Sequence, residues 1–414
     1  MPFDWWTFVV PAACAGTLMP LAIRARSIGH DQVGGVQKVH DAPTSRLGGA
    51  VIFVAFLAAL GVAHSGGDPA MRAAMPLAVA ALPVVMIGLV EDLTRAVRPR
   101  YRLLAAAVSA ALAGVYAGGV VPRIDVAFVD RLLAYAWFAL PLTWFMVVGA
   151  CNAINLIDGA HGLAAGTALI MFGGIALAAH GSGDATTLAP TLAVMGALAG
   201  FMAWNYPGGR VFLGDAGAYF VGFMYAELAI QLVARNAGIS AWYVIVLAGY
   251  PIVDTLFSMY RRGVVRGLPL MSPDGLHLHS LVYRRIAVPL EMRAGARVAA
   301  ERRIGERRGH AATQAAAPLV ERRRGERRQG ERDRRLVNLR RANARVAPRL
   351  WVHGALCFAL AVLFHDNTPA LWGCLLVYAA FYVSRYRSLV RFGQRHARPP
   401  APVEREADAA KPMR

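Results

Sequence analysis

Charged residues are scarce in this chain of 414 residues: they make up 17% of it, whereas hydrophobic residues make up 57%. A water-soluble domain carries about 25% charged residues, so the composition excludes an ordinary soluble protein. Segments that alternate apolar and polar residues are also lacking. This excludes a transmembrane β-barrel and leaves helices to satisfy the backbone hydrogen bonds in lipid. The sequence therefore predicts an all-α integral membrane protein.

Cysteine is rare, and basic residues are lacking before the first apolar run. The four cysteines lie in or beside apolar runs without the spacing of metal ligands, so we expect them to be small core residues. They are Cys14, Cys151, Cys357 and Cys374. Arg24 and Arg26 follow the first apolar run, which is typical of a retained membrane anchor rather than of a signal peptide.

Apolar runs long enough to cross a bilayer occur about eleven times in the chain. A helix needs about 20 such residues to cross about 30 Å of hydrocarbon. The candidate spans are 5–23, 47–64, 74–90, 103–121, 133–151, 162–180, 187–204, 216–234, 239–257, 350–366 and 370–386. The sequence thus predicts a polytopic protein with about eleven transmembrane helices.

The net charge of +19 is unevenly distributed along the chain. With the N-terminus outside, 40 of the 44 Lys and Arg residues fall in or beside the loops after the odd-numbered spans. Cytoplasmic loops of membrane proteins are enriched in Lys and Arg. We therefore expect the N-terminus outside, in the periplasm or its equivalent, and the C-terminus in the cytoplasm.

Five polar segments interrupt the apolar pattern, after spans 1, 3, 5, 7 and 9, and the alternation of spans puts all five on the cytoplasmic face. They contain the candidate site residues Lys38, His40, Glu91, Asp92, Asn152, Asn155, Asp158, His161, Asn205, Phe212, Asp215, His277 and His279. Such a set beside an apolar wall suits a reaction between a water-soluble phosphorylated donor and a lipid-borne acceptor. A proton-coupled transporter needs ionisable residues near the bilayer midplane, and the span centres contain almost none.

Three of these segments carry acids or imidazoles whose roles the residues alone leave open. Asp215 follows a glycine and directly precedes a helix, and helix starts attract anions and metal-bound phosphates. Glu91 and Asp92 lie where a span leaves lipid, and they either coordinate a metal or pair with nearby arginines. His277 and His279 either bind metal or contact phosphate. The abundance of oxygen ligands suits a hard cation better than zinc.

The segment 291–349 differs from the rest because nearly half of its residues are charged, and ERRIGERR at 301–308 recurs as ERRRGERR at 321–328. We expect a solvated spacer; a tether to anionic lipid and an RNA-binding segment are the alternatives. No aromatic residue lies between Tyr283 and Trp351 to stack on bases, so no nucleic acid is expected. The predicted organisation is a catalytic transmembrane core at 1–290, the insert at 291–349, two spans within 350–386 and a disordered cytoplasmic tail at 387–414.

The five polar segments carry recognisable motifs. QKVHDAPTSRLGG is similar to RKxHxxPxPRLGG, and GLVEDLTRAVRPRYRLL is similar to GxxDDxxxL followed by a basic-Leu pair. NAINLIDGAHGL resembles NAxNxxDGxDGL, NYPGGRVFLGDAG resembles NxxPAxxFMGDxG, and SPDGLHLHSL resembles PDRxHxHHL. Together, across residues 37–281, they resemble the polyprenyl-phosphate N-acetylhexosamine-1-phosphate transferases, a superfamily that includes the phospho-MurNAc-pentapeptide translocase.

The resemblance implies transfer of a sugar-1-phosphate from a UDP-sugar to undecaprenyl phosphate, with release of UMP and with Mg²⁺ or Mn²⁺ as cofactor. It implies metal binding by Asp215 and Asp92, and handling of the lipid phosphate by Glu91 with Asp92. Phe212 is expected to stack on uracil beside Asn205. By position, the remaining substrate contacts are expected from Lys38, His40, Asn152, Asn155, Asp158 and His161, with His277 and His279 in the diphosphate region.

Four residues depart from these motifs: Glu91 and His161 each replace an Asp, Gly275 replaces an Arg, and Ser280 replaces a His. The departures leave open a non-catalytic or transport-type membrane protein of the same descent. A lipid phosphate has a second pKa of ~6, so at pH 7 a general base at Glu91 saves little more than ~1.4 kcal/mol. Asp215 is therefore expected to matter more than Glu91.

Several properties stay open at the level of sequence. The sequence does not specify which sugar is transferred. It also does not specify the product polymer, for which O-antigen lipopolysaccharide, capsule, exopolysaccharide and a teichoic-acid-like polymer are alternatives. Direct attack by the lipid phosphate and a covalent aspartyl-phosphosugar intermediate are both compatible with the motifs. A monomer and a homodimer are equally compatible with them.

Overall fold

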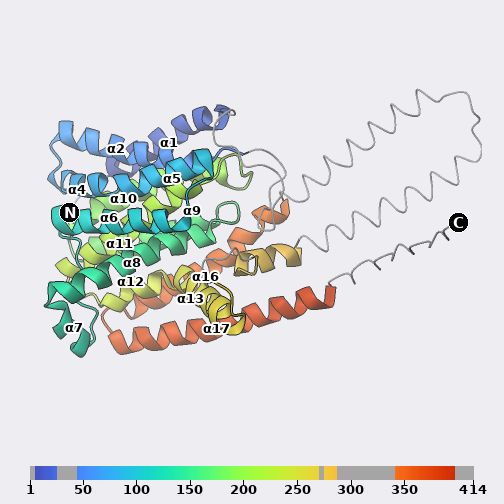
Figure 1. Ribbon diagram of the computed structural model, residues 1–414. Helices are drawn as coiled ribbons and strands as arrows, with labels where there is room; N and C mark the ends of the chain where they lie inside the picture. The colour runs from blue at the N-terminus through green and yellow to red at the C-terminus, as the bar shows by residue number, and fades with distance from the viewer. Residues whose placement is uncertain (1–4, 26–43, 270–274, 287–340, 397–414) are drawn as a thin grey trace, which may run out of the picture.

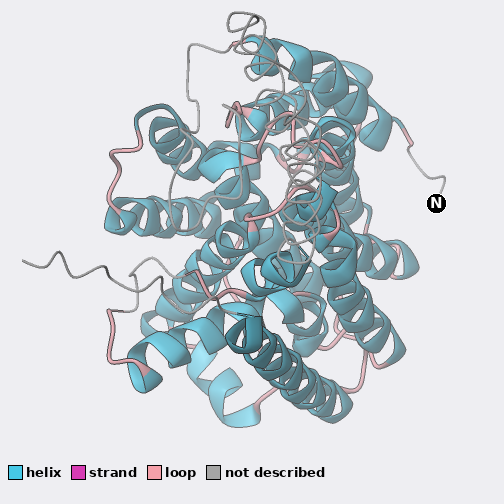
Figure 2. Cartoon of the chain, turned by 90° about the vertical axis from the view of Figure 1, so that its right-hand side faces the viewer, coloured by secondary structure: helices cyan, strands magenta, loops and turns pink. Residues whose placement is uncertain are grey.

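The computed structural model describes residues 5–25, 44–269, 275–286 and 341–396. Lys38, His40, most of the 291–349 insert and the residues after 396 lie outside this part of the chain. The described residues form a bundle of helices without a named strand, apart from one isolated parallel bridge between Ser45 and Val211 (Figures 1 and 2). The predicted all-α membrane fold is confirmed.

The helices follow the predicted spans closely. They are α1 (Trp6–Arg24), α2 (Gly48–Gly66), α3 (Pro69–Arg72), α4 (Met75–Ala80), α5 (Leu82–Thr94), α6 (Pro99–Tyr116), α7 (Ala127–Leu133), α8 (Ala136–Ile157), α9 (Leu163–Gly181), α10 (Ala185–Asn205), α11 (Gly214–Arg235), α12 (Ala241–Leu247), α13 (Gly249–Tyr260), α16 (Val346–Leu363) and α17 (Thr368–His396). A π-helical turn, η1 (Arg261–Val265), continues α13, and residues 278–286 form a further helical segment.

Among the described residues, seven helices are long and apolar enough to cross a membrane. Two bent pairs raise that number to nine: Pro69–Ala80 with Leu82–Thr94, and Ala241–Leu247 with Gly249–Val265. The bends measure 52° and 75°. Helices α6 and α17 coincide with two further predicted spans but are not among these nine. The structure thus supports a polytopic protein with seven to nine spans by length and composition, compared with about eleven expected from the sequence.

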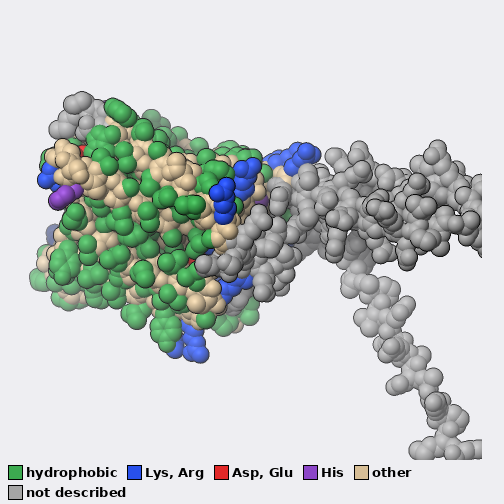
Figure 3. Space-filling view, turned by 90° about the horizontal axis from the view of Figure 1, so that it is seen from above, with side chains coloured by type: hydrophobic (Ala, Val, Ile, Leu, Met, Phe, Trp, Pro, Cys, Tyr) green, Lys and Arg blue, Asp and Glu red, His purple; other side chains and the backbone are tan. Residues whose placement is uncertain are grey.

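Large apolar side chains on the bundle surface are arranged for contact with lipid. Hydrophobic side chains cover most of the face drawn in Figure 3, and Lys and Arg lie mainly toward its ends. On α8, for example, Trp137 is 68% exposed and Phe145 is 71% exposed. Exposed apolar surface of this extent marks a membrane-facing region.

Helix α11 is the centre of the bundle, because its whole membrane-crossing window is buried. Glycines on two neighbouring helices let their backbones approach its first turn. A Cβ at Gly49 on α2 would lie 2.0 Å from the backbone nitrogen of Gly217. A Cβ at Gly88 on α5 would lie 2.5 Å from the Cα of Ala216. Small residues commonly allow such close contacts between membrane helices, and here they fix the position of the start of α11.

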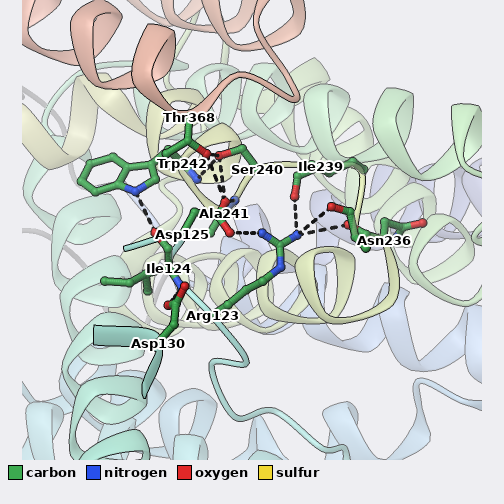
Figure 4. A network of polar contacts seen from close by, with 11 residues as sticks. Arg123, Ile124, Asp125, Asp130, Asn236, Ile239, Ser240, Ala241, Trp242 and Thr368 are labelled. Atoms are coloured by element: carbon green, nitrogen blue, oxygen red, sulfur yellow. Dashed lines mark hydrogen bonds and ion pairs between the residues drawn. The ribbon is translucent and has the colours of Figure 1, made fainter. Parts of the chain in front are cut away.

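A polar network holds the helices together at the C-terminal end of α11 (Figure 4). Asp125 accepts hydrogen bonds from the Ala241 amide (2.7 Å) and the Ser240 hydroxyl (3.0 Å), and it forms an ion pair with Arg123. Arg123 also donates to the Ile239 carbonyl at 2.6 Å. Burial alone would raise the pKa of Asp125, but the hydrogen bonds and the charge of Arg123 outweigh burial and lower it. The network ties the α6–α7 loop to the α11–α12 turn, from which the bent pair α12–α13 starts.

Candidate active site

Asp215 lies in the first turn of α11, where helices α6, α8 and α11 meet. Its carboxylate forms an ion pair with Arg102 of α6 and accepts a hydrogen bond from the Asn155 amide of α8 at 3.2 Å. Asp215 is 8% exposed. The unpaired N–H groups at the start of a helix carry positive partial charge, so this corner combines a carboxylate, a guanidinium and a helix N-terminus. Such a set can bind a phosphate together with a metal ion.

Asp92 is fully buried on α5, and its carboxylate caps α11. One oxygen accepts the backbone N–H of Asp215 and the other accepts that of Ala216, each at 2.9 Å. Arg46 lies 3.7 Å from the same carboxylate. The neighbouring Glu91 instead accepts the backbone N–H of Val97 at 2.9 Å and is half-buried. The two adjacent acids therefore have separate partners, and Asp92 directly positions Asp215.

Asp158 follows the last residue of α8 and faces the same corner. Burial, with a smaller effect of the negative charge of Asp215, raises the pKa of Asp158 to about 7, and Arg46 acts in the opposite direction. Burial has this effect because it disfavours the charged form of a carboxyl group. Asn152, one turn before Asn155 on α8, is half-buried.

His161, Asn205 and Phe212 pack against one another around the loop that joins α8 to α9. The His161 ring stacks on Phe212, with 6.0 Å between the ring centroids and 29° between the planes. Asn205 accepts the Gly162 N–H and donates to the Val211 carbonyl, both at 2.6 Å. The Asn205 amide therefore joins two of the motif loops.

His277 and His279 lie side by side, with parallel rings whose centroids are 5.7 Å apart. His277 Nδ1 is 3.0 Å from Asp254, and that carboxylate also accepts the Tyr382 hydroxyl at 2.5 Å. His279 packs on Gly159, where an added Cβ would lie 2.1 Å from Nε2. Burial, together with the charge of His277, lowers the pKa of His279 to about 4, so His279 is neutral at physiological pH. The histidine pair thus reaches the loop that carries Asp158.

Several partners of these residues come from parts of the chain that the motifs do not single out. Asn343, close before α16, accepts the backbone N–H of His161 at 2.9 Å. Trp351 of α16 donates to the Gly162 carbonyl at 3.2 Å. Asn343 belongs to the last residues of the Arg-rich insert and Trp351 follows the insert, so the end of the insert contacts the α8–α9 loop. A polar Asn in a charged segment gives no sequence signal for this contact.

Few protein side chains at this site are available as ligands for a metal ion. Among the described residues, no group of three or more His, Cys, Asp and Glu side chains is placed to hold one. Mg²⁺ is commonly bound through one or two carboxylates together with substrate phosphates and water. Asp215 and Asp158 fit that pattern because both carboxylates lie at the start of α11, whereas both oxygens of Asp92 already accept N–H groups.

Comparison with known proteins identifies the family. A family model described as Glycosyl transferase family 4 matches residues 74–233, which include Asp92, Asp158 and Asp215. The probable undecaprenyl-phosphate N-acetylglucosaminyl 1-phosphate transferase of Bacillus subtilis is 31% identical over 279 residues, which cover 66% of this chain and 75% of that protein.

Two further relatives carry related names. The phospho-N-acetylmuramoyl-pentapeptide-transferase of Halalkalibacterium halodurans is 31% identical over 203 residues, covering 47% of this chain and 61% of that protein. The undecaprenyl-phosphate alpha-N-acetylglucosaminyl 1-phosphate transferase of Thermotoga maritima is 29% identical over 214 residues, covering 51% and 62%. The predicted superfamily is confirmed: this chain belongs to glycosyl transferase family 4 and is a membrane-embedded phosphotransferase.

Proposed function

We propose that the protein transfers a sugar-1-phosphate, namely an N-acetylhexosamine 1-phosphate, from a UDP-sugar to undecaprenyl phosphate and releases UMP. The reaction takes place at the cytoplasmic face of the bacterial inner membrane and initiates a cell-envelope polysaccharide. The observation that carries this proposal is the cluster of Asp215, Arg102 and Asn155 at the start of α11. The names of the relatives, which specify polyprenyl phosphates and N-acetylated amino sugars, support the choice of substrates.

Phosphoryl transfer depends mainly on the positioning of the two reactants and on the compensation of the negative charge of their phosphates. An oxygen of the lipid phosphate attacks the β-phosphorus of the donor, and the bond from that phosphorus to the bridging oxygen breaks, so that the electron pair leaves with UMP. Arg102 and Arg46 supply positive charge for the phosphates. The positive end of the α11 dipole adds to this charge, while the N–H groups of Asp215 and Ala216 donate to Asp92. Asp215 and Asp158 would hold Mg²⁺, which would supply positive charge to the donor diphosphate. The lipid phosphate is mostly dianionic at pH 7, with a second pKa of ~6, and needs no general base.

An apolar cavity gives the acceptor chain a place beside this cluster. Its volume is about 250 Å³, and it lies between α8, α11 and the bent pair α12–α13. Ile154 of α8, which lines it, directly precedes Asn155, the hydrogen-bond partner of Asp215. A polyprenyl chain in this cavity would keep its phosphate near Asp215 while its isoprene units remain in an apolar environment.

The experiment that tests this function is UMP release from a panel of UDP-sugars by the purified full-length protein, with undecaprenyl phosphate as acceptor. Release that depends on both the acceptor and one UDP-sugar supports the proposal and names the sugar. No release with any member of the panel would favour the non-catalytic or transport-type alternative. Exchange of labelled UMP into the UDP-sugar without acceptor would indicate a covalent intermediate and contradict direct attack.

Asn343→Ala is expected to raise the KM for the UDP-sugar about tenfold, with kcat changed less than about threefold. The substitution removes the acceptor of the buried His161 N–H, and an unsatisfied buried donor costs ~1–3 kcal/mol. The α8–α9 loop would then shift around His161 and Phe212. Steady-state kinetics over a range of UDP-sugar concentrations measures the effect.

Asn367→Ala is the matched control, because Asn367 accepts the Ala370 N–H at the start of α17 and touches no motif loop. It should leave both KM and kcat at parental values. An unchanged KM in Asn343→Ala would show that the contact between the two segments does not shape the donor site.

A further inference from the structure

A second cavity is lined in part by the helical segment 278–286 and shares no lining residue with the apolar cavity described above. It has a volume of about 440 Å³ and is enclosed by residues 278–286, α16 and α17. Its wall is half apolar and half basic. The apolar side chains are Leu278, Val282, Ile286, Leu350 and Leu389, and the basic ones are Arg285, Arg349, Arg385 and His353. The candidate active site does not use any of these side chains.

The three arginines that line the cavity have no acidic partner in the part of the chain that the structure describes. Arg285 lies over the Phe392 ring at 5.2 Å, and Arg349 donates to the Arg345 carbonyl at 2.6 Å. No Asp or Glu among the described residues lines the cavity. Asp254 acts electrostatically on His353 of the cavity wall, but it does not line the cavity, and its carboxylate is bound by His277 and Tyr382. Three uncompensated guanidinium groups around one cavity form a site for an anion, and the guanidinium fork matches phosphate in geometry.

The surroundings of the cavity favour an anion that belongs to a lipid. Farther along α17, toward its N-terminus, Leu376 is 73% exposed and Val377 is 70% exposed, as expected for a surface in hydrocarbon. From Arg385 onward the helix carries Arg385, Arg387 and Arg391. The cavity therefore lies where α17 changes from apolar to basic, which is where lipid headgroups meet a membrane helix. A free anion would use the basic half of the wall but not the apolar half.

We propose that this cavity binds the headgroup phosphate of an anionic phospholipid, with Arg285, Arg349 and Arg385 around the phosphate and the five apolar side chains against the start of the acyl chains. The bound lipid would join three segments that are separate in the sequence. One of them, 278–286, contains His279, and another, α17, contains Tyr382, which donates to Asp254 beside His277. The lipid thus supports the packing of the C-terminal hairpin against the histidine pair. This binding does not depend on the proposed reaction.

The test is binding of phosphatidylglycerol to the full-length protein in a neutral detergent, measured by native mass spectrometry, with phosphatidylcholine and inorganic phosphate as the other two probes. A solution at ~0.5 M salt shortens the screening length to about 4 Å and suppresses attraction to exposed charges. Parent and variants share residues 291–348 of the Arg-rich insert, so the contribution of those residues is common to all of them. We expect phosphatidylglycerol to bind at least tenfold more tightly than phosphatidylcholine, and millimolar inorganic phosphate not to displace it.

The triple variant R285Q/R349Q/R385Q is expected to bind phosphatidylglycerol about tenfold more weakly than the parent. The matched control is R72Q/R131Q/R235Q, which removes the same charge from exposed arginines outside the cavity and should bind like the parent. If the triple variant does not fold, each single variant is expected to lose about threefold. Equal binding by the parent and the cavity variants, or equal binding of the two lipids, would overturn the proposal. Displacement by inorganic phosphate would reassign the cavity to a free anion.

Discussion

Asp215→Asn is expected to lower sugar-phosphate transfer at least 100-fold, to the background of the assay, while the protein stays folded. The substitution keeps the shape of the side chain and the backbone N–H that Asp92 accepts, so the cap of α11 survives. What it removes is the negative charge beside Arg102 and Asn155. Removal of one preorganised charge contact from an active site commonly costs ~10²–10³ in rate. Initial rates of UMP release, together with the elution profile and thermal unfolding of the detergent-solubilised protein, measure both properties.

The control for this experiment is the same substitution at the start of another helix. Asp184 caps α10 through the Thr187 N–H at 3.1 Å and also accepts the Asn236 amide near the C-terminal end of α11, far from Asp215. Asp184→Asn should therefore retain activity within about twofold, because an asparagine oxygen can still cap α10 and the side chain touches no substrate. If Asp215→Asn kept half of the parental activity, Asp215 would have no essential role in the reaction.

The sequence predicts the membrane helices well where an apolar run is continuous and bounded by glycine or Asx residues. The predicted span 216–234 corresponds to α11 (Gly214–Arg235), and 162–180 corresponds to α9 (Leu163–Gly181). The two bent spans were predicted as single helices, because hydropathy does not register a change in direction. Pro83 follows the first break and cannot donate a backbone hydrogen bond across it. Gly249 and Pro251 follow the second break, so both bends had a local signal in the sequence.

In the candidate site, by contrast, the contacts between residues far apart in the chain could not be predicted from the sequence. The residue types and their spacing make Asp215 a candidate but leave its partner open, and only the packing of α6 against α11 selects Arg102, 113 residues away. The contact of Asn343 with His161 spans 182 residues and starts from the end of the Arg-rich insert. Glu227 was also missed: it is fully buried in the middle of α11, and neither carboxylate oxygen has a hydrogen-bond partner in the described structure. A single carboxyl group changes the average hydropathy of a long apolar run only slightly, so the average does not reveal it.

Asp92→Asn is expected to lower both stability and activity, which distinguishes it from Asp215→Asn. The Asp92 carboxylate accepts two N–H groups of the first turn of α11, whereas an asparagine offers one acceptor and places an NH₂ group against the other N–H. An unsatisfied buried donor costs ~1–3 kcal/mol, and a lost charge at a helix N-terminus adds ~0.3–1 kcal/mol. The start of α11 would shift, and Asp215 with it, so we expect transfer to fall at least about tenfold. Thermal unfolding in detergent and initial rates of UMP release measure the two effects.

Glu91→Gln is the matched control, because it makes the same change of carboxylate to amide at the adjacent residue. Glu91 accepts only the Val97 N–H among the interactions seen in the described residues, and a glutamine oxygen can accept the same bond. The lipid phosphate, with a second pKa of ~6, is already mostly dianionic at pH 7, so a base at this position has little to contribute. Activity within about threefold of the parent is therefore expected. A large loss in Glu91→Gln together with a small loss in Asp92→Asn would reverse the two roles and would make Glu91, not Asp92, the acid on which the start of α11 depends.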